Sequence, residues 1–172
     1  MKLVVVGDPP VEITSFLARR RALGQDRFDE VWEGEYHVVP APHPWHGYID
    51  KALARLLDPL AAAAGLTGTT TFNLGKHDNF RVPDGGYHRG VPSEVFVPTA
   101  AIVVEVVSPD DETWLKFDFY AGHGVEEICI ADPRRREVRW FVLAGDQYQE
   151  AGASPLLGAT AADLVAGIDW PG

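Results

Sequence analysis

The apolar run at residues 100–107 dominates the hydrophobic pattern of the chain. Apolar side chains at 102–104 and 106–107 point to both faces of any strand that forms here, without alternation. Such a strand is expected at the centre of a sheet, covered on both sides. Glu105 interrupts the run, in a place where an unpaired charge costs roughly several kcal/mol. The pattern therefore predicts a buried glutamate that needs a partner.

A helix is predicted directly after this strand. Ser108 fits its N-cap, Pro109 fits the first helical position, and Asp111 completes an S-x-x-D capping box. Three polar side chains then recur at four-residue steps on one helix face: Glu112, Lys116 and Tyr120. This spacing returns the ammonium group of Lys116 toward the end of the strand that carries Glu105.

The N-terminal part of the chain is predicted to combine short strands and helices. Residues 2–6 fit a strand, and residues 11–23 fit an amphipathic helix that Gly24 ends. Residues 27–39 fit a hairpin that turns at Glu33-Gly34. The clearest helix has its apolar residues at helical spacing between Ile49 and residue 64, and Pro59 predicts a kink or a break within it.

The remaining segments are predicted from β-branched runs and turn residues. A threonine-rich strand is expected over residues 67–74, and residues 87–95 fit a loop or an irregular strand. Residues 125–148 fit a meander of strands joined by tight turns. A second capping box, Thr160-x-x-Asp163, opens a short helix that reaches about residue 166.

Length and composition fit one soluble domain that spans residues 1–172. The apolar fraction is 46% and the charged fraction 23%, and no apolar run approaches the roughly 18 residues of a membrane span. The N-terminus lacks the features of a signal peptide, so we expect a cytoplasmic protein. The single cysteine, Cys129, lies in an apolar strand pattern and is expected to be buried.

The net charge of −10 argues against broad, nonspecific affinity for nucleic acids, because phosphate binding draws on lysine and arginine. Two local basic clusters stand against this acidic background. They are Arg19–Arg21 with Arg27, and Arg134–Arg136 with Arg139. A solvated helix end and a charged hairpin turn explain these clusters equally well.

Two carboxylates and a lysine form the candidate chemistry. Asp84 in a Pro-Asp turn and Glu105 on the buried strand would suit magnesium, which usually takes one or two carboxylates with waters and substrate phosphate. The carbonyl of Val106 could add a third oxygen, and Lys116 could orient water or stabilise the attacked phosphate. Two structural alternatives stay open: Asp84 as a turn residue, and Lys116 paired with Glu112.

The same residues resemble a known family. The run Val-Glu-Val-Val-Ser-Pro at 104–109, then Glu112-x-x-x-Lys116-x-x-x-Tyr120 and the Val-Pro-Asp step at 82–84, is similar to the Uma-type putative restriction endonuclease family of the PD-(D/E)xK nuclease superfamily. The resemblance implies an α/β restriction-endonuclease-like core: a central mixed β-sheet flanked by helices, with a magnesium site at one sheet edge.

Carried over by position, the resemblance assigns the site residues. Asp84 matches the aspartate of the motif and Glu105 its second acidic residue, while Val107 stands where the E-x-K lysine is usual and Lys116 matches a relocated lysine. Glu30 and His46 match positions that line the same cleft. The glycines after Asp84 depart from the apolar strand of the family and argue against a rigid Asp84.

The resemblance implies an Mg²⁺-dependent endodeoxyribonuclease-like hydrolase, with Mn²⁺ as a substitute and DNA as substrate. A homodimer is expected by analogy, because cutting both strands needs two sites. The alternative is a catalytically inactive nuclease-fold protein that acts as a DNA- or protein-binding module, which the acidic composition favours. Hydrolysis of a small phosphorylated substrate is a third option.

Overall fold

The chain is described by a computed structural model, which covers residues 3–108 and 112–171. Its larger sheet is built around β9 (Ile102–Val106), all five residues of which are buried. β9 pairs in parallel with β10 (Glu127–Asp132) and antiparallel with β7 (Gly85–His88). The predicted central strand, covered on both faces, is confirmed.

The rest of the larger sheet extends on both sides of β9. β11 (Glu137–Ala144) and β12 (Gln147–Ala151) continue it antiparallel from β10, which confirms the predicted meander. β4 (Thr67–Thr70) forms the other edge by pairing with β7. The strand order is β12-β11-β10-β9-β7-β4, so the sheet is mixed.

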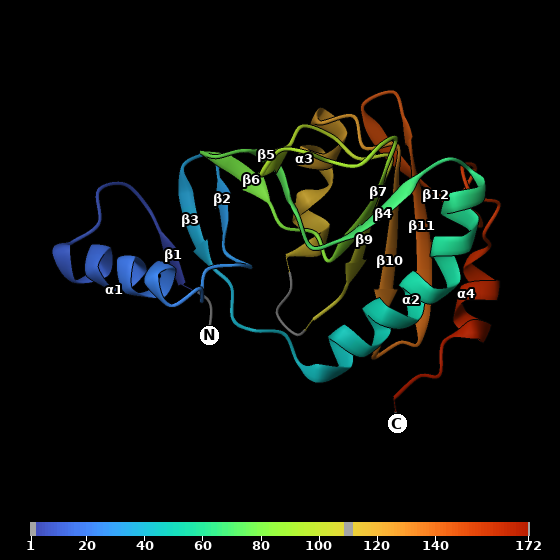
Figure 1. Cartoon of the computed structure of the whole chain (residues 1–172), viewed down its shortest axis with the longest axis horizontal. Coiled ribbons are helices and arrows are strands. Elements are labelled where there is room, and N and C mark those ends of the chain that lie inside the picture. Colours follow the sequence, from blue (N-terminus) through green and yellow to red (C-terminus); the bar gives the residue numbers. More distant parts are fainter. Residues whose placement is uncertain (1–2, 109–111, 172) are drawn as a thin grey trace.

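Helices cover both faces of this sheet (Figure 1). α2 (Pro44–Ala63) and α4 (Ala161–Gly167) share one apolar cluster with Val104 and Trp140, whereas α3 (Phe117–Gly122) shares the other cluster with Val103. The side chains of β9 therefore enter two separate cores. This arrangement confirms the expected central mixed sheet flanked by helices.

A smaller sheet lies beside the first and brings the N-terminal part of the chain to it. Its strands, in spatial order, are β1 (Leu3–Val5), β3 (Glu35–Val38), β2 (Glu30–Trp32), β6 (Asn79–Arg81), β5 (Asn73–Lys76) and β8 (Phe96–Val97). The predicted hairpin is β2 and β3, and its turn residues Glu33 and Gly34 have φ angles of 46° and 89°. Positive φ at both turn positions matches the twist of a two-residue hairpin.

Two strand predictions need correction. The strand expected over residues 67–74 is divided, because the chain leaves the larger sheet after β4 and enters the smaller one as β5. The segment after Asp84, expected as a loop or an irregular strand, begins with the fully buried regular strand β7. A Cβ atom at Gly86 would lie 2.6 Å from Phe72 Cε1, so glycine is what allows this close packing.

The helices also differ in part from the predictions. α1 (Val11–Ala22) forms as expected but buries none of its residues, and it projects from the two sheets (Figure 1). Of the predicted kink or break at Pro59, the break does not occur, because α2 continues through this residue. The predicted capping box at Ser108–Asp111 includes residues outside the described part. After it, a 3₁₀ turn (Thr113–Lys116) leads into α3.

The remaining expectations are met where the structure tests them. Thr160 caps α4 by accepting a hydrogen bond from Asp163 N at 3.0 Å. Cys129 is fully buried. Within residues 3–108 and 112–171, no helix combines the length and apolarity needed to cross a membrane. A single domain over residues 1–172 stays a prediction.

Candidate active site

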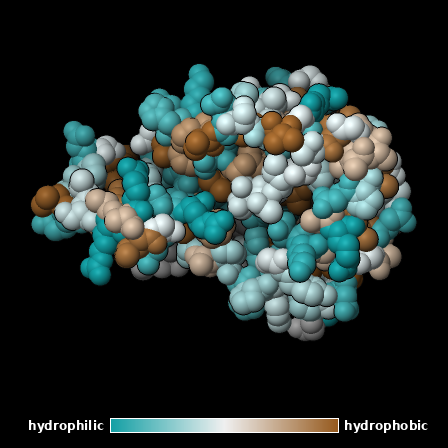
Figure 2. Space-filling view, viewed as in Figure 1, coloured by the Kyte–Doolittle hydropathy of each residue, from teal (hydrophilic) through white to brown (hydrophobic). Residues whose placement is uncertain are grey.

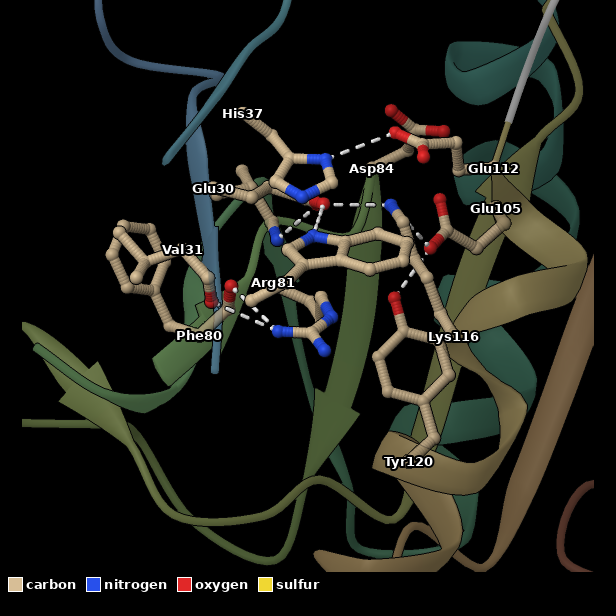
Figure 3. Close-up of polar contacts among 12 residues, drawn as sticks. Glu30, Val31, His37, Phe80, Arg81, Asp84, Glu105, Glu112, Lys116 and Tyr120 are labelled. Atoms are coloured by element: carbon tan, nitrogen blue, oxygen red, sulfur yellow. Dashed lines mark hydrogen bonds and ion pairs between the residues drawn. The ribbon is translucent and has the colours of Figure 1, made fainter. Parts of the chain in front are cut away.

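Lys116 lies between two buried carboxylates. Its Nζ is 2.9 Å from Oε1 of Glu30 and 3.2 Å from Oε1 of Glu105 (Figure 3). The lysine side chain comes from the 3₁₀ turn before α3, and the two glutamates come from β2 and β9. The structure therefore confirms that the helix returns Lys116 to Glu105, and it adds Glu30 as a second anion.

Glu105 is held by two donors within the core. Its side chain is 4% exposed, and Oε1 accepts hydrogen bonds from Lys116 Nζ and from the Tyr120 hydroxyl. Burial raises the pKa of Glu105, although the charge of Lys116 opposes this shift. Burial and the Glu105 carboxylate also raise the pKa of Tyr120, so its hydroxyl stays a donor. Burial thus outweighs the ammonium group in setting how readily Glu105 binds a proton.

The charge on Lys116 is stabilised by the same neighbours. Burial alone would lower its pKa, but the carboxylates of Glu105 and Glu30 outweigh burial and raise it above the ordinary value. Lys116 therefore stays protonated throughout the physiological pH range. An ammonium group with fixed charge and position is suited to stabilise negative charge on a bound substrate.

Glu30 is fixed by three contacts. Oε1 accepts a hydrogen bond from Val82 N at 2.7 Å in addition to its contact with Lys116, and Oε2 accepts one from Trp32 Nε1 at 2.7 Å. Trp32 was not among the residues predicted for the site. The alternation of β2 contained the signal, because residues two apart on a strand share a face.

Asp84 is anchored at the end of β9. Its Oδ2 accepts a hydrogen bond from Val106 N at 2.8 Å and lies 3.0 Å from His46 Nε2. His46 comes from the first turn of α2. The expectation that the glycines after Asp84 would leave it loose is wrong, because those glycines form β7 and the carboxylate is tied to β9.

The acidic character of the site shifts the pKa of two neighbours on α2. Burial lowers the pKa of His46, but the hydrogen bond and charge of Asp84 outweigh burial and raise it overall. The pKa of Asp50 is raised to about 6 by burial and by the charge of Asp84. The charge of Asp84 thus contributes to both shifts, while burial is the largest cause of the Asp50 shift.

Glu112 and His37 form one wall of the site. His37 Nδ1 lies 3.2 Å from Glu112 Oε2, and the imidazole stacks on Trp32 with ring centroids 4.5 Å apart. His37 pairs with Glu30 across the hairpin, which places both on one face of the smaller sheet. The sequence prediction included Glu112 but missed His37, although the two-residue turn fixes this register.

Metal binding at this site stays a prediction. In the described residues, no group of three or more histidine, cysteine, aspartate or glutamate side chains is arranged to hold a metal ion. The predicted ligands are fewer: the carboxylates of Asp84 and Glu105 and the carbonyl of Val106. Magnesium usually takes one or two carboxylates and keeps several waters.

Comparison with known proteins places the chain in a family. The model of Uma2, described as "putative restriction endonuclease", matches residues 16–169. The chain belongs to the Uma2 family. The match confirms the resemblance seen in the sequence motifs around Glu105 and Lys116.

A solved structure shows the same fold. The crystal structure of a putative nuclease belonging to DUF820 from Anabaena variabilis is similar to this chain with a TM-score of 0.66 and 15% sequence identity. The similarity covers 81% of this chain and 90% of that chain. No curated protein sequence matches this Uma2 member significantly. The restriction-endonuclease-like fold is thus confirmed.

Proposed function

We propose that this chain is a metal-dependent endonuclease that hydrolyses phosphodiester bonds of DNA. The family and the fold support a nuclease, and one observation carries the assignment of the site. Lys116 is held between the buried carboxylates of Glu30 and Glu105 at the end of a strand where Asp84 is also anchored. This arrangement places a fixed ammonium group beside two acidic ligand candidates.

The residues present fit a bound magnesium ion. The site contains the carboxylates of Glu30, Glu105 and Asp84 against the ammonium group of Lys116, and His46 is charged only when protonated. Burial raises the pKa of Glu105 even beside Lys116. A divalent cation would offset this excess negative charge, with Asp84, Glu105 and the Val106 carbonyl as its ligands.

Magnesium bound there would supply positive charge at the attacked phosphate and favour deprotonation of the attacking water. Lys116 would donate hydrogen bonds to a phosphate oxygen or orient that water, since its charge is maintained by Glu105 and Glu30. Tyr120 holds Glu105 in place through its hydroxyl. His46 orients Asp84 from the opposite side.

A second candidate is a nuclease-fold protein without catalysis, acting as a DNA- or protein-binding module. A specific observation favours it: Oε1 of Glu105 already accepts hydrogen bonds from Lys116 and Tyr120, which satisfies that oxygen without a metal. In that case the buried pair stabilises a unique core arrangement and performs no chemistry.

Nicking of supercoiled plasmid DNA separates the two candidates. We expect activity with Mg²⁺ or Mn²⁺, none in EDTA, and none for Glu105→Gln. Glu127→Gln is the matched control, because Glu127 is a buried glutamate on β10 whose carboxylate accepts hydrogen bonds from Ser154 and Leu156 instead. Activity in Glu105→Gln equal to that of the control would contradict the proposal.

A homodimer with two active sites is also part of the proposal. A homodimer would place two sites on one duplex and allow both strands to be cut. Light scattering coupled to size exclusion measures the mass in solution. A dimer is expected to convert nicked plasmid to linear plasmid quickly, whereas a monomer would accumulate nicked circles.

A further inference from the structure

A cleft of about 570 Å³ lies against the smaller sheet. Aromatic side chains line the cleft: Phe80 from β6, Phe96 from β8, Tyr36 from β3, and Phe72 from the link between β4 and β5. Phe80 and Phe96 meet edge to face, with ring centroids 5.2 Å apart. The cleft is therefore an aromatic platform on a β-sheet, a surface suited to stacking with planar groups.

This cleft is separate from the acidic site. Glu30 and Trp32 on β2 point to Lys116, and Arg81 on β6 lies over Trp32, so these residues occupy one face of the smaller sheet. Val31 lies between Glu30 and Trp32 on β2, and Phe80 directly precedes Arg81 on β6. Val31 and Phe80 pair across the two strands, and both line the cleft instead. Alternation along the strands thus places the two features on opposite faces.

The rim of the cleft carries two arginines and two aspartates, in a chain with a net charge of −10. Arg21 and Arg27 lie at and after the end of α1, and Arg21 Nε is 3.6 Å from Asp26 Oδ2 in a pair open to solvent, since the Arg21 side chain is 77% exposed. The carboxylate of Asp29 is already compensated by Arg20 at 2.8 Å and by the Tyr36 hydroxyl at 3.0 Å. Figure 2 shows hydrophilic side chains interspersed with hydrophobic ones over the projecting arm that contains α1.

We propose that this cleft binds a single strand of nucleic acid, with bases against the aromatic side chains and phosphates at Arg21 and Arg27. Stacking on aromatic rings and contacts from arginine are the two interactions that single-strand binding proteins combine. The inference rests on the proposed nuclease function and deepens it, because it names the form of the substrate.

The cleft and the acidic site are connected along the chain. Val82 lines the cleft, and Asp84 lies in the site only two residues later, which is at most about 7 Å of extended chain. The end of β6 thus joins the cleft to the acidic site, although the two lie on opposite faces of the smaller sheet. A double helix, whose bases are stacked and paired, could not place a base in the cleft without unpairing.

Fluorescence anisotropy of a labelled oligothymidine of about 12 nucleotides tests the proposal in EDTA, where cleavage does not occur. Two variants, Arg27→Glu and the double variant Phe80→Leu/Phe96→Leu, are compared with Arg134→Glu, which changes an exposed arginine after β10. We expect each cleft variant to bind about tenfold more weakly, and Arg134→Glu to remain within about twofold of the wild type. Circular dichroism checks that the double variant is folded.

Three results would overturn the inference. The first is unchanged binding in folded cleft variants, and the second is an equal loss of binding in Arg134→Glu. The third is a dimer that the cleft substitutions convert to monomers, which would make the cleft a surface for a second copy.

The plasmid assay keeps the two proposals apart. Cleft-dependent binding without any metal-dependent cleavage supports the inference and contradicts the nuclease function. Metal-dependent cleavage by the wild type, with oligonucleotide binding that the cleft substitutions leave unchanged, supports the nuclease function and contradicts the inference.

Discussion

Lys116 Nζ lies 2.9 Å from Oε1 of Glu30, closer than its 3.2 Å distance to Glu105. The hairpin of the smaller sheet therefore contributes directly to the charge of the candidate site. Glu30 is itself fixed by Val82 N and Trp32 Nε1, so it can hold the ammonium group in one position. Together with Glu105, Glu30 therefore keeps Lys116 charged and oriented.

Replacing Glu30 by glutamine tests that role. The amide keeps the shape of the side chain but removes one of the carboxylates that raise the pKa of Lys116. The basic limb of the pH–rate profile for plasmid nicking is expected to move to lower pH. Glu33→Gln, in the turn of the same hairpin, is the control and should leave the limb in place. An unshifted limb in Glu30→Gln would show that Glu30 has only a structural role.

Removing the lysine should destabilise the fold in a pH-dependent way. Lys116→Met leaves the buried carboxylates of Glu30 and Glu105 without their cation, a loss of about 3–5 kcal/mol in the free energy of unfolding near neutral pH. The loss should shrink toward pH 4, because Glu105 binds a proton more readily in the folded state. Urea unfolding at several pH values measures it. A loss below about 1 kcal/mol at pH 7 would contradict the buried ion pair.

Asp50 provides a titration signal next to the site. Its pKa is raised from 3.8 to about 6, so the folded state binds more protons than the unfolded state between these values, and stability falls as pH rises through this window. Asp50→Asn should abolish that fall and be more stable than the wild type at pH 7. Carbon-13 NMR of the carboxyl group reads the pKa directly, and Mg²⁺ should lower it. An ordinary pKa without metal would argue against the excess negative charge.

The packing of Gly86 fixes the strand that follows Asp84. Its alanine variant would place a Cβ atom 2.6 Å from Phe72 Cε1, and the overpacking is expected to cost about 1–3 kcal/mol. Gly90→Ala is the matched control, since a Cβ atom there meets nothing within 4 Å. Thermal unfolding compares the two. Equal stability of both variants would mean that β7 does not need glycine at Gly86.

The central part of the fold was predictable because its signals are local. The apolar run around Glu105 identifies a strand buried on both faces, and the steps from Glu112 to Tyr120 identify one helix face. The same two patterns bring Lys116 to Glu105, as the structure confirms. The motifs that carry the family resemblance lie in this stretch, so fold and family could be predicted together.

The contribution of the smaller sheet could not be predicted with the same certainty. Nothing in the threonine-rich run marks the point between β4 and β5 where the chain changes sheets. Contacts such as that of Glu30 with Lys116 join segments far apart in the sequence, which local patterns do not describe. A period-two pattern places Glu30 and Trp32 on one face, but it does not say which element that face will meet. Similarly, the pattern of α1 predicts a helix without revealing that it buries none of its residues.

Metal binding between Asp84 and Glu105 is the central claim, and a crystal soaked with Mn²⁺ tests it most directly. The account predicts an anomalous difference peak in contact with both carboxylates and with the Val106 carbonyl, and none in crystals of Glu105→Gln. A fully soaked wild-type crystal without such a peak, with Lys116 still bridging Glu30 and Glu105, would show that the buried pair is structural and would contradict the account.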